Sequence, residues 1–264
     1  MPSAKTGATA NRSRHVLPPL LTVAALLALW QVLGNGSTIF SPPSRIMAAL
    51  WRTRALLPAH IATTLTETVL GTIVGVVGGV AVAVSTVALP LFGRAVQPML
   101  IASQTVPVQI LSPLLVLWFG FGLAPKIVVV ALVVFFPVAV STNAGLRSAD
   151  SETLDLVRSL GASKAQQFRF LLAPAALPAA LSGLRISLTY AVAAAAISES
   201  IGSTSGLGLY ISRSQRGFRY DQVFVGVLVV TTLSMLLFSI VYLLDRVLCP
   251  WRHSVGDGST ASLR

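Results

Sequence analysis

The chain has 264 residues, of which 54% are hydrophobic and only 10% are charged. Soluble domains are closer to a quarter charged, so this composition excludes a soluble enzyme, a disordered protein and a disulfide-rich secreted module. The apolar runs are continuous rather than alternating, which argues against a transmembrane β-barrel. A membrane-spanning helix takes about 20 residues, and the length therefore has room for roughly six spans. We expect an all-α polytopic membrane protein.

The net charge is +11, from 19 lysines and arginines against 8 acidic residues. The basic residues are spread through the tails and loops, which is typical of helix orientation and contact with anionic lipid rather than nucleic-acid binding. Cys249 is the only cysteine, so an internal disulfide is excluded. The three histidines lie far apart and outside the expected spans, and we predict no metal site.

The N-terminal third contains a tail, two spans and a short helix between the spans. We expect a cytoplasmic tail over residues 1–15 and an uncleaved first span over 16–33, because no clear signal-peptide cleavage site follows that run. Residues 45–57 are too short and too charged to span, and they predict an interfacial amphipathic helix. The second span, 64–89, contains a G-x-x-x-G pair at Gly71 that lets another helix approach closely.

The remaining spans are expected at similar spacing. A short loop over 90–97 precedes a third span over 98–119, which carries Pro107 and Pro113. Prolines are tolerated in a membrane helix only where neighbours satisfy the freed backbone groups. The other predicted boundaries are a fourth span at 126–142, a charged loop at 143–177, a fifth span at 178–198, a sixth at 223–244 and a C-terminal tail at 249–264.

Charge placement indicates that both termini lie in the cytoplasm, because more lysines and arginines then fall on the inner side. Arg213, Arg216 and Arg219 are exceptions on the outer side, and the sequence does not explain them.

The charged loop reads as two short helices that meet at a turn. Gly161 is a typical C-terminal stop for the first helix. Ser163 is placed to cap a second helix over 164–172, which we expect to break before Pro174. This arrangement makes a compact knob suited to docking against a soluble protein.

This loop resembles the conserved cytoplasmic signature of binding-protein-dependent ABC transporter permeases, which reads E-A-A-x3-G-x9-I-x-L-P. Gly161 and Pro174 match at the right spacing, and Asp155 keeps the charge of the glutamate. The chain departs from the signature at Leu156, Val157 and Ala173.

The resemblance extends over about residues 63–248. The stretches at 111–122, 175–186 and 202–208 are similar to the family's P-L-x-x-x-W-F-G-x-G, A-A-L-P…G-L-R and G-x-x-x-G-L-G segments. They resemble the branch that contains nitrate, sulfonate and taurine permeases and permeases for thiamine-precursor pyrimidines such as hydroxymethylpyrimidine, with a lean towards the heterocycle importers.

The resemblance implies a type I ABC importer permease in the bacterial inner membrane. It implies a permease dimer, formed by two copies of this chain or by this chain and a close relative, a pair of separate ABC ATPase subunits that bind ATP and Mg²⁺, and an extracytoplasmic substrate-binding protein. It assigns contact with the ATPase to Asp155, Leu156, Val157, Gly161, Ala162, Ser163 and Pro174. The lysines of the sequence independently support a separate ATPase. None of them follows a glycine, so the chain has no Walker A motif and is not itself the ATPase.

Polar residues in or near the spans are candidates for the translocation pathway, and equally for hydrogen bonds between helices. These are Gln104, Gln109, Tyr190, Ser198 and Glu199. Glu199 either lines a gate or pairs with an arginine of the 213–219 cluster, and we expect Glu67 to have a structural partner. Arg185 is expected to pair with an acid of the charged loop or to reach lipid headgroups.

Two other classes of protein fit the sequence less well. An intramembrane serine hydrolase would need a G-x-S-x-G turn, and residues 202–206 carry threonine at the serine position. A proton-coupled carrier without a motor is separated from a permease by whether an ATPase copurifies with the chain.

Overall fold

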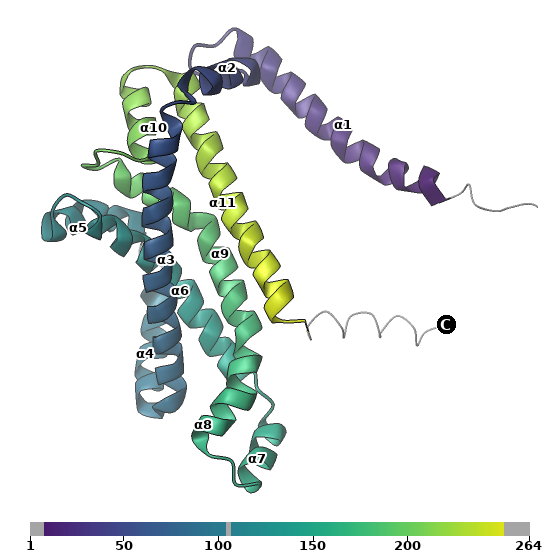
Figure 1. The fold of residues 1–264 in the computed structure, drawn as a ribbon, viewed down its shortest axis with the longest axis vertical. Coiled ribbons are helices and arrows are strands. Elements are labelled where there is room, and N and C mark those ends of the chain that lie inside the picture. The colour runs from purple at the N-terminus through teal and green to yellow at the C-terminus, as the bar shows by residue number, and fades with distance from the viewer. Residues whose placement is uncertain (1–7, 104–106, 251–264) are drawn as a thin grey trace, which may run out of the picture. The chain divides into compact units, whose positions relative to one another are not determined.

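The computed structural model describes residues 8–103 and 107–250, and within these ranges the secondary structure is helical with no strand (Figure 1). The elements are α1 (Ala8–Asn35), α2 (Pro43–Thr53), α3 (Leu57–Ala88), α4 (Pro90–Ser103), η1 (Val108–Leu111), α5 (Ser112–Phe119), α6 (Ala124–Arg147), α7 (Ser151–Ser159), α8 (Lys164–Gln167), η2 (Phe168–Leu172), α9 (Ala173–Glu199), α10 (Leu207–Arg216) and α11 (Tyr220–Leu248). The chain forms two compact units, residues 1–56 with 211–227 and residues 57–210 with 228–264.

The first unit contains the short amphipathic helix that the sequence predicts. In α2, Ile46, Ala49 and Thr53 are buried on one face. Beside this face, the exposed Arg52 forms an ion pair of 2.9 Å with Asp221. The spacing of small and apolar residues at three- and four-residue intervals therefore gives α2 one packed face and one charged face.

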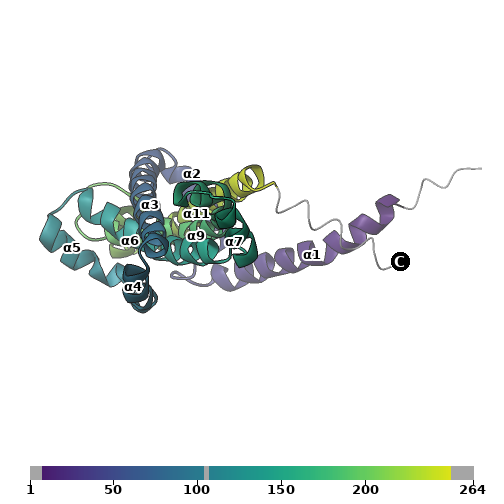
Figure 2. The same cartoon turned by 90° about the horizontal axis from the view of Figure 1, so that it is seen from below.

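In the core of the second unit, α6 packs against both α3 and α9, and Figure 2 views these helices from below. Helices α3 and α6 run parallel: the Cβ of a residue at position 71 would lie 2.5 Å from Val130 Cβ, and that of one at 79 would lie 2.9 Å from the Phe135 carbonyl oxygen. Glycine at these positions lets the two backbones touch, which confirms the close approach expected from the G-x-x-x-G pair.

Helices α6 and α9 run antiparallel. Gly145 lies against Ala176 and Ala179, while Gly183 lies against the carbonyl of Pro137 and Ser141. From the Gly183 contact towards the end of α9, the core consists mainly of valine, leucine and alanine from α6 and α9, and it includes Val130, Val134, Val138, Leu188, Ala191 and Ala195.

Four of the described helices are long and apolar enough to cross a membrane: Leu57–Ala88, Ala124–Arg147, Lys164–Glu199 and Tyr220–Leu248. They correspond to the predicted second, fourth, fifth and sixth spans, and each is longer than its prediction. The sequence marks the apolar middle of each span, and the helix continues into the more polar residues at its ends because intrahelical hydrogen bonds extend beyond the apolar stretch.

The third predicted span is wrong as a single helix. Residues 90–97 are not a loop but the start of α4, because Pro90 stands at a first helical position, where its missing N–H costs nothing. Helix α4 is described as far as Ser103, Pro107 lies outside a helix, and the described chain continues as η1 and α5. Pro107 lacks the N–H that a continuous helix would need there, whereas Pro113 lies in the first turn of α5, where a missing N–H costs nothing.

The first predicted span lies in α1, which begins at Ala8, so residues 8–15 of the expected tail are helical. Its apolar portion, Leu21–Asn35, is shorter than the four long spans. Pro18 and Pro19 lie inside this helix.

Candidate functional site

The charged loop folds into a knob, defined here as residues 150–172, at the end of the second unit that α7 and α8 occupy (Figure 1). Helix α7 begins at Asp150, whose carboxylate accepts hydrogen bonds from the backbone N–H groups of Glu152 and Thr153 and from the Thr153 hydroxyl. These hydrogen bonds, first among them the one from the Thr153 hydroxyl, lower the pKa of Asp150 below its usual value of 3.8.

Helix α7 ends in a Schellman motif centred on Gly161. The Gly161 N–H donates to the Arg158 carbonyl at 2.9 Å, and the Ala162 N–H donates to the Val157 carbonyl at 3.2 Å. Gly161 has a φ of +82°, which L side chains rarely adopt, and a Cβ added there would meet no atom within 4 Å. The glycine is therefore required by backbone conformation and not by lack of space, as the sequence predicts.

Helix α8 begins with a full capping box. The Ser163 hydroxyl accepts from the Gln166 N–H at 3.3 Å, and the Gln166 side chain accepts from the Ser163 N–H at 2.8 Å. The prediction that Ser163 caps this helix is thus confirmed.

The expected break before Pro174 is wrong. The chain passes from α8 through the π-helical turn η2 into α9 as one helix, Lys164–Glu199. In η2 the Ala173 N–H donates to the Phe168 carbonyl, five residues back. The wider turn relieves the clash that a proline ring makes with the preceding turn of an α-helix, so the helix continues past Pro174.

The knob presents apolar side chains on an otherwise polar segment. Leu156, Leu160 and Phe170 are 59%, 78% and 71% exposed. A groove of about 270 Å³ runs beside them and is lined by Val157, Leu160, Gly161, Ala162, Gln166 and Phe170.

The other residues predicted for the knob surround this surface. Asp155 is exposed and forms an ion pair of 3.1 Å with Arg158. Pro174 is exposed at the start of α9, and Val157 is half-buried. Six of the seven residues predicted for contact with the ATPase therefore lie in the knob, and Pro174 follows it at the start of α9.

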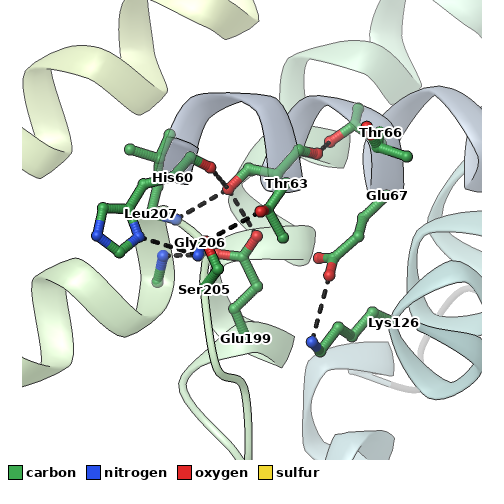
Figure 3. A network of polar contacts seen from close by, with 12 residues as sticks. His60, Thr63, Thr66, Glu67, Lys126, Glu199, Ser205, Gly206 and Leu207 are labelled. Atoms are coloured by element: carbon green, nitrogen blue, oxygen red, sulfur yellow. Dashed lines mark hydrogen bonds and ion pairs between the residues drawn. The ribbon is translucent and has the colours of Figure 1, made fainter. Parts of the chain in front are cut away.

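A second polar group lies at the far end of α3, α6 and α9 from the knob, and the sequence did not reveal it as a unit (Figure 3). Lys126, in the first turn of α6, forms an ion pair of 3.2 Å with Glu67 of α3. The predicted structural partner of Glu67 is therefore a lysine on another helix. Lys126 lies at the edge of its span, as expected, and it is buried.

Glu199, at the end of α9, lies in the same group (Figure 3). Its carboxylate accepts a hydrogen bond of 2.6 Å from the Thr64 hydroxyl and another of 2.6 Å from the Gly208 N–H. Of the two alternatives left open for Glu199, a gate or a pair with an arginine, neither is tested by these bonds, which join its two oxygens to a hydroxyl and a backbone N–H of the second unit.

Helix α3 also holds the residues just before Gly208. The Leu207 N–H donates to Thr64 Oγ1 at 2.9 Å, the Gly206 N–H donates to His60 Nδ1 at 3.0 Å, and the Thr63 hydroxyl donates to Ser205 Oγ at 3.0 Å. Sequence reasoning missed this role of α3. The signal was present as polar residues at positions 60, 63, 64 and 67, a three- and four-residue spacing that puts them on one helix face.

The predicted pathway residues do not form one cluster. Tyr190 is 60% exposed on α9, whereas Ser198 and Glu199 are fully buried on the same helix. Gln104 lies outside the described residues, and Gln109 lies in η1, where its side chain is not described.

Arg185 has an acidic partner, but on a different element from the one expected. It donates to Asp245 of α11 at 2.7 Å instead of to an acid of the knob. The ring of Tyr242 lies 5.1 Å from its guanidinium carbon.

Residues 71–251 match the model of the binding-protein-dependent transport system inner membrane component family. The chain belongs to this family. It is 34% identical over 246 residues to the formylaminopyrimidine transport permease protein ThiX of Halalkalibacterium halodurans, which covers 92% of this chain and 98% of that protein. It is 32% identical over 261 residues to the taurine transport system permease protein TauC of Escherichia coli, with 92% of each chain covered.

The fold agrees with that of solved ABC importers. The MetNI methionine ABC transporter, solved in inward-facing conformations, superposes with a TM-score of 0.65 at 22% identity, covering 75% of this chain and 98% of the matched chain. An amino acid ABC transporter superposes with a TM-score of 0.62 at 18% identity, covering 76% of this chain and 97% of the other.

The chain is therefore the membrane permease subunit of an ABC importer with the type I fold. In this family the permease does not carry the ATPase active site, which belongs to a separate subunit. The family works with an ATPase and a substrate-binding protein, as the sequence motifs imply.

Proposed function

We propose that the knob is the contact through which the ATPase subunits drive this permease. Three local devices make the knob rigid: the Asp150 cap, the Schellman turn at Gly161 and the Ser163 capping box. Exposed leucine and phenylalanine side chains beside a groove provide the apolar contact that a docking partner would bury. ATP and Mg²⁺ are held by that partner and not by this chain.

The same proposal sets the orientation in the bacterial inner membrane. The knob lies in the cytoplasm, where ATP is available, and the polar group around Glu199 lies at the outer ends of the spans. The ion pair between Arg185 and Asp245 supports this, because it places the last turns of α11 alongside the knob-proximal half of α9. Both termini, with the tails 1–15 and 249–264, then lie in the cytoplasm, and residues 16–248 form the permease domain.

The pathway is formed between two copies of the chain. One face of α9 is uncovered in the protomer and includes Ile186, Tyr190 and Ile197, which are 56%, 60% and 46% exposed. The opposite face of the same helix is buried against α6. A second copy that presents the same face would enclose a pathway lined by α9, and Ser198 and Glu199 then support this helix from behind.

The solute is a small uncharged heterocycle of the thiamine-precursor pyrimidine type. The observation that carries this choice is the uncovered α9 face, which offers an aromatic ring at Tyr190 and a hydroxyl at Thr189 and has no basic residue among Ile186, Thr189, Tyr190 and Ile197. A planar ring can stack on tyrosine, whereas a sulfonate would be expected to meet a cation. The extended similarity to ThiX agrees with this choice, and taurine or an aliphatic sulfonate is the second candidate because of the similar match to TauC.

Uptake by a strain that lacks this gene tests the solute. The plasmid-borne chain should restore uptake of labelled formylaminopyrimidine, and Tyr190→Ala should reduce that uptake more than Tyr190→Phe. Restored uptake of taurine or alkanesulfonates, with none of the pyrimidine, would reverse the assignment.

Substitution of Gly161 tests the docking contact. Gly161→Val forces a β-branched residue into a left-handed conformation and should lower the yield of the permease–ATPase complex, whereas Gly161→Asn tolerates that conformation and should keep it. Normal complex yield and normal uptake with Gly161→Val contradict the assignment.

A further inference from the structure

A single helix connects the knob to the polar group at the other end of the second unit. The helix Lys164–Glu199 has 36 residues, begins within the knob and ends at Glu199. At 1.5 Å per residue it is about 54 Å long. A displacement of its first turn can therefore be carried along one continuous element to its last residue.

The chain directly after this helix is held to α3 residue by residue. Hydrogen bonds join Ser205 to Thr63, Gly206 to His60 and Leu207 to Thr64. A further hydrogen bond joins Gly208 to Glu199 at the end of α9. We call residues 205–208 the latched segment (Figure 3).

Glu199 is the centre of this arrangement because its carboxylate accepts hydrogen bonds from both α3 and the latched segment. It accepts from Thr64 on α3 and from Gly208 in the latched segment, each at 2.6 Å, and it is fully buried. Short hydrogen bonds to a buried carboxylate are stronger than those between neutral groups.

The two glycines of the latched segment pack closely against Glu199 and the end of α9, where a side chain would not fit. A Cβ at position 206 would lie 2.5 Å from each Glu199 carboxylate oxygen, and Gly206 has a φ of +121°. A Cβ at position 208 would collide with the Ala196 carbonyl of α9. The G-L-G sequence therefore fits around the end of α9 and leaves no room for side chains.

We propose that Glu199 is a positioning residue that fastens the latched segment to α3 and to the end of α9, so that movement of the knob is transmitted to the outer end of the permease. The proposal rests on the docking contact under Proposed function. It deepens that function by naming the residue that receives the movement at the far end of the helix.

The test measures coupling in the assembled transporter, reconstituted in proteoliposomes with its ATPase and binding protein. Glu199→Gln keeps the size of the side chain but removes its charge, and Glu199→Ala removes both bonds. The solute transported per ATP hydrolysed should fall about tenfold with Glu199→Ala, the loss expected for a hydrogen bond to a charged group, and less with Glu199→Gln. Ser200→Ala is the matched control, because the exposed Ser200 hydroxyl bonds only the Ile197 carbonyl of its own helix.

If the role of Glu199 is to hold the latched segment against α3, a disulfide between the two should replace it. The Thr63 and Ser205 hydroxyl oxygens are 3.0 Å apart, so Thr63→Cys with Ser205→Cys offers a cross-link between α3 and the latched segment. Oxidation of this pair in the Glu199→Ala background should restore the transport-to-ATP ratio, and reduction should remove the rescue.

The possible results separate the two proposals. An unchanged ratio with Glu199→Ala, or a cross-link that forms without rescue, overturns the positioning role while leaving the docking contact intact. If Glu199→Ala does not assemble, Thr64→Val provides the test, because it removes the hydroxyl that Glu199 accepts from; a ratio that falls about threefold or more supports the role, while an unchanged ratio overturns it. Failure of Gly161→Val to disturb ATPase binding would instead remove the docking contact on which the inference rests.

Discussion

Lys126 and Glu67 form an ion pair of 3.2 Å in which the lysine side chain is 8% exposed and the glutamate side chain 1%. The pair joins the first turn of α6 to α3 in the parallel contact that forms the core of the second unit. Removing one member of a buried pair leaves an uncompensated charge, whereas removing both does not.

Lys126→Met should therefore destabilise the permease by about 3–5 kcal/mol, the usual cost of breaking a buried ion pair. Thermal unfolding of the purified permease–ATPase complex in detergent measures the effect. The double variant Glu67→Gln, Lys126→Met is the control and should unfold at a higher temperature than either single variant. If the two single losses simply add, the pair has no energetic coupling and this account is wrong.

The glycines of α3 predict a matched contrast. A Cβ at position 75 would lie 2.6 Å from the Ala131 carbonyl oxygen, whereas one at position 78 would come no closer than 3.4 Å to the Phe135 ring. Gly75→Ala should cost about 1–3 kcal/mol by overpacking. Gly78→Ala should stabilise α3 by up to about 1 kcal/mol, because alanine favours the helix.

The same unfolding measurement checks both glycine variants, and uptake shows whether the change reaches function. Equal behaviour of the two variants would mean that α3 and α6 are not packed as closely as described.

Asp150 predicts how the knob responds to pH. Its pKa is lowered in the folded state by the hydrogen bonds from Thr153 and Glu152, so this contribution to stability is present above the unfolded pKa of 3.8 and is lost as pH falls through the lower folded value. Between pH 5 and 8 the protection of α7 amides against hydrogen exchange, corrected for intrinsic rates, should therefore stay constant.

Asp150→Ala should reduce that protection at every pH in the window, and Asp150→Asn should largely keep it, since asparagine is also a good helix N-cap. A rise or fall of wild-type protection across this range would show that another group controls the start of α7.

We expect Arg185 to stabilise the fold through both its charge and its planar shape. It bonds Asp245 at 2.7 Å, and its guanidinium carbon lies 5.1 Å from the Tyr242 ring. Arg185→Lys keeps the charge but loses the planar group that contacts the ring. We expect Arg185→Met to lower the unfolding temperature more than Arg185→Lys, and both to lower it more than Arg246→Met, a nearby arginine with no described ion pair. Equal effects of the Arg185 variants and the Arg246 variant would contradict a specific tie between α9 and α11.

Local signals explain which features could be predicted from sequence. The stop at Gly161 and the cap at Ser163 depend on residues within a few positions of one another, and both are present as expected. The long spans were also recognisable, because an apolar run of this length has few alternatives in a membrane protein.

Features that depend on distant residues were not predictable in this way. Glu199 bonds Thr64, which is separated from it by 135 positions, and no pattern in a single sequence links the two. The π-helical turn that carries the helix past Pro174 was missed because proline ordinarily predicts a boundary. Arg185 was assigned an acid nearby in sequence, while its partner Asp245 lies on another span.

The wide turn at Phe168–Leu172 has a mechanical consequence. Pro174 has no amide hydrogen to donate to the preceding turn, so the wide turn before it forfeits no hydrogen bond from that position. The wide turn therefore sets the orientation of the knob about the axis of its own helix. Under the proposed contact, an ATPase that moves the knob would move the continuous helix Lys164–Glu199 as one body.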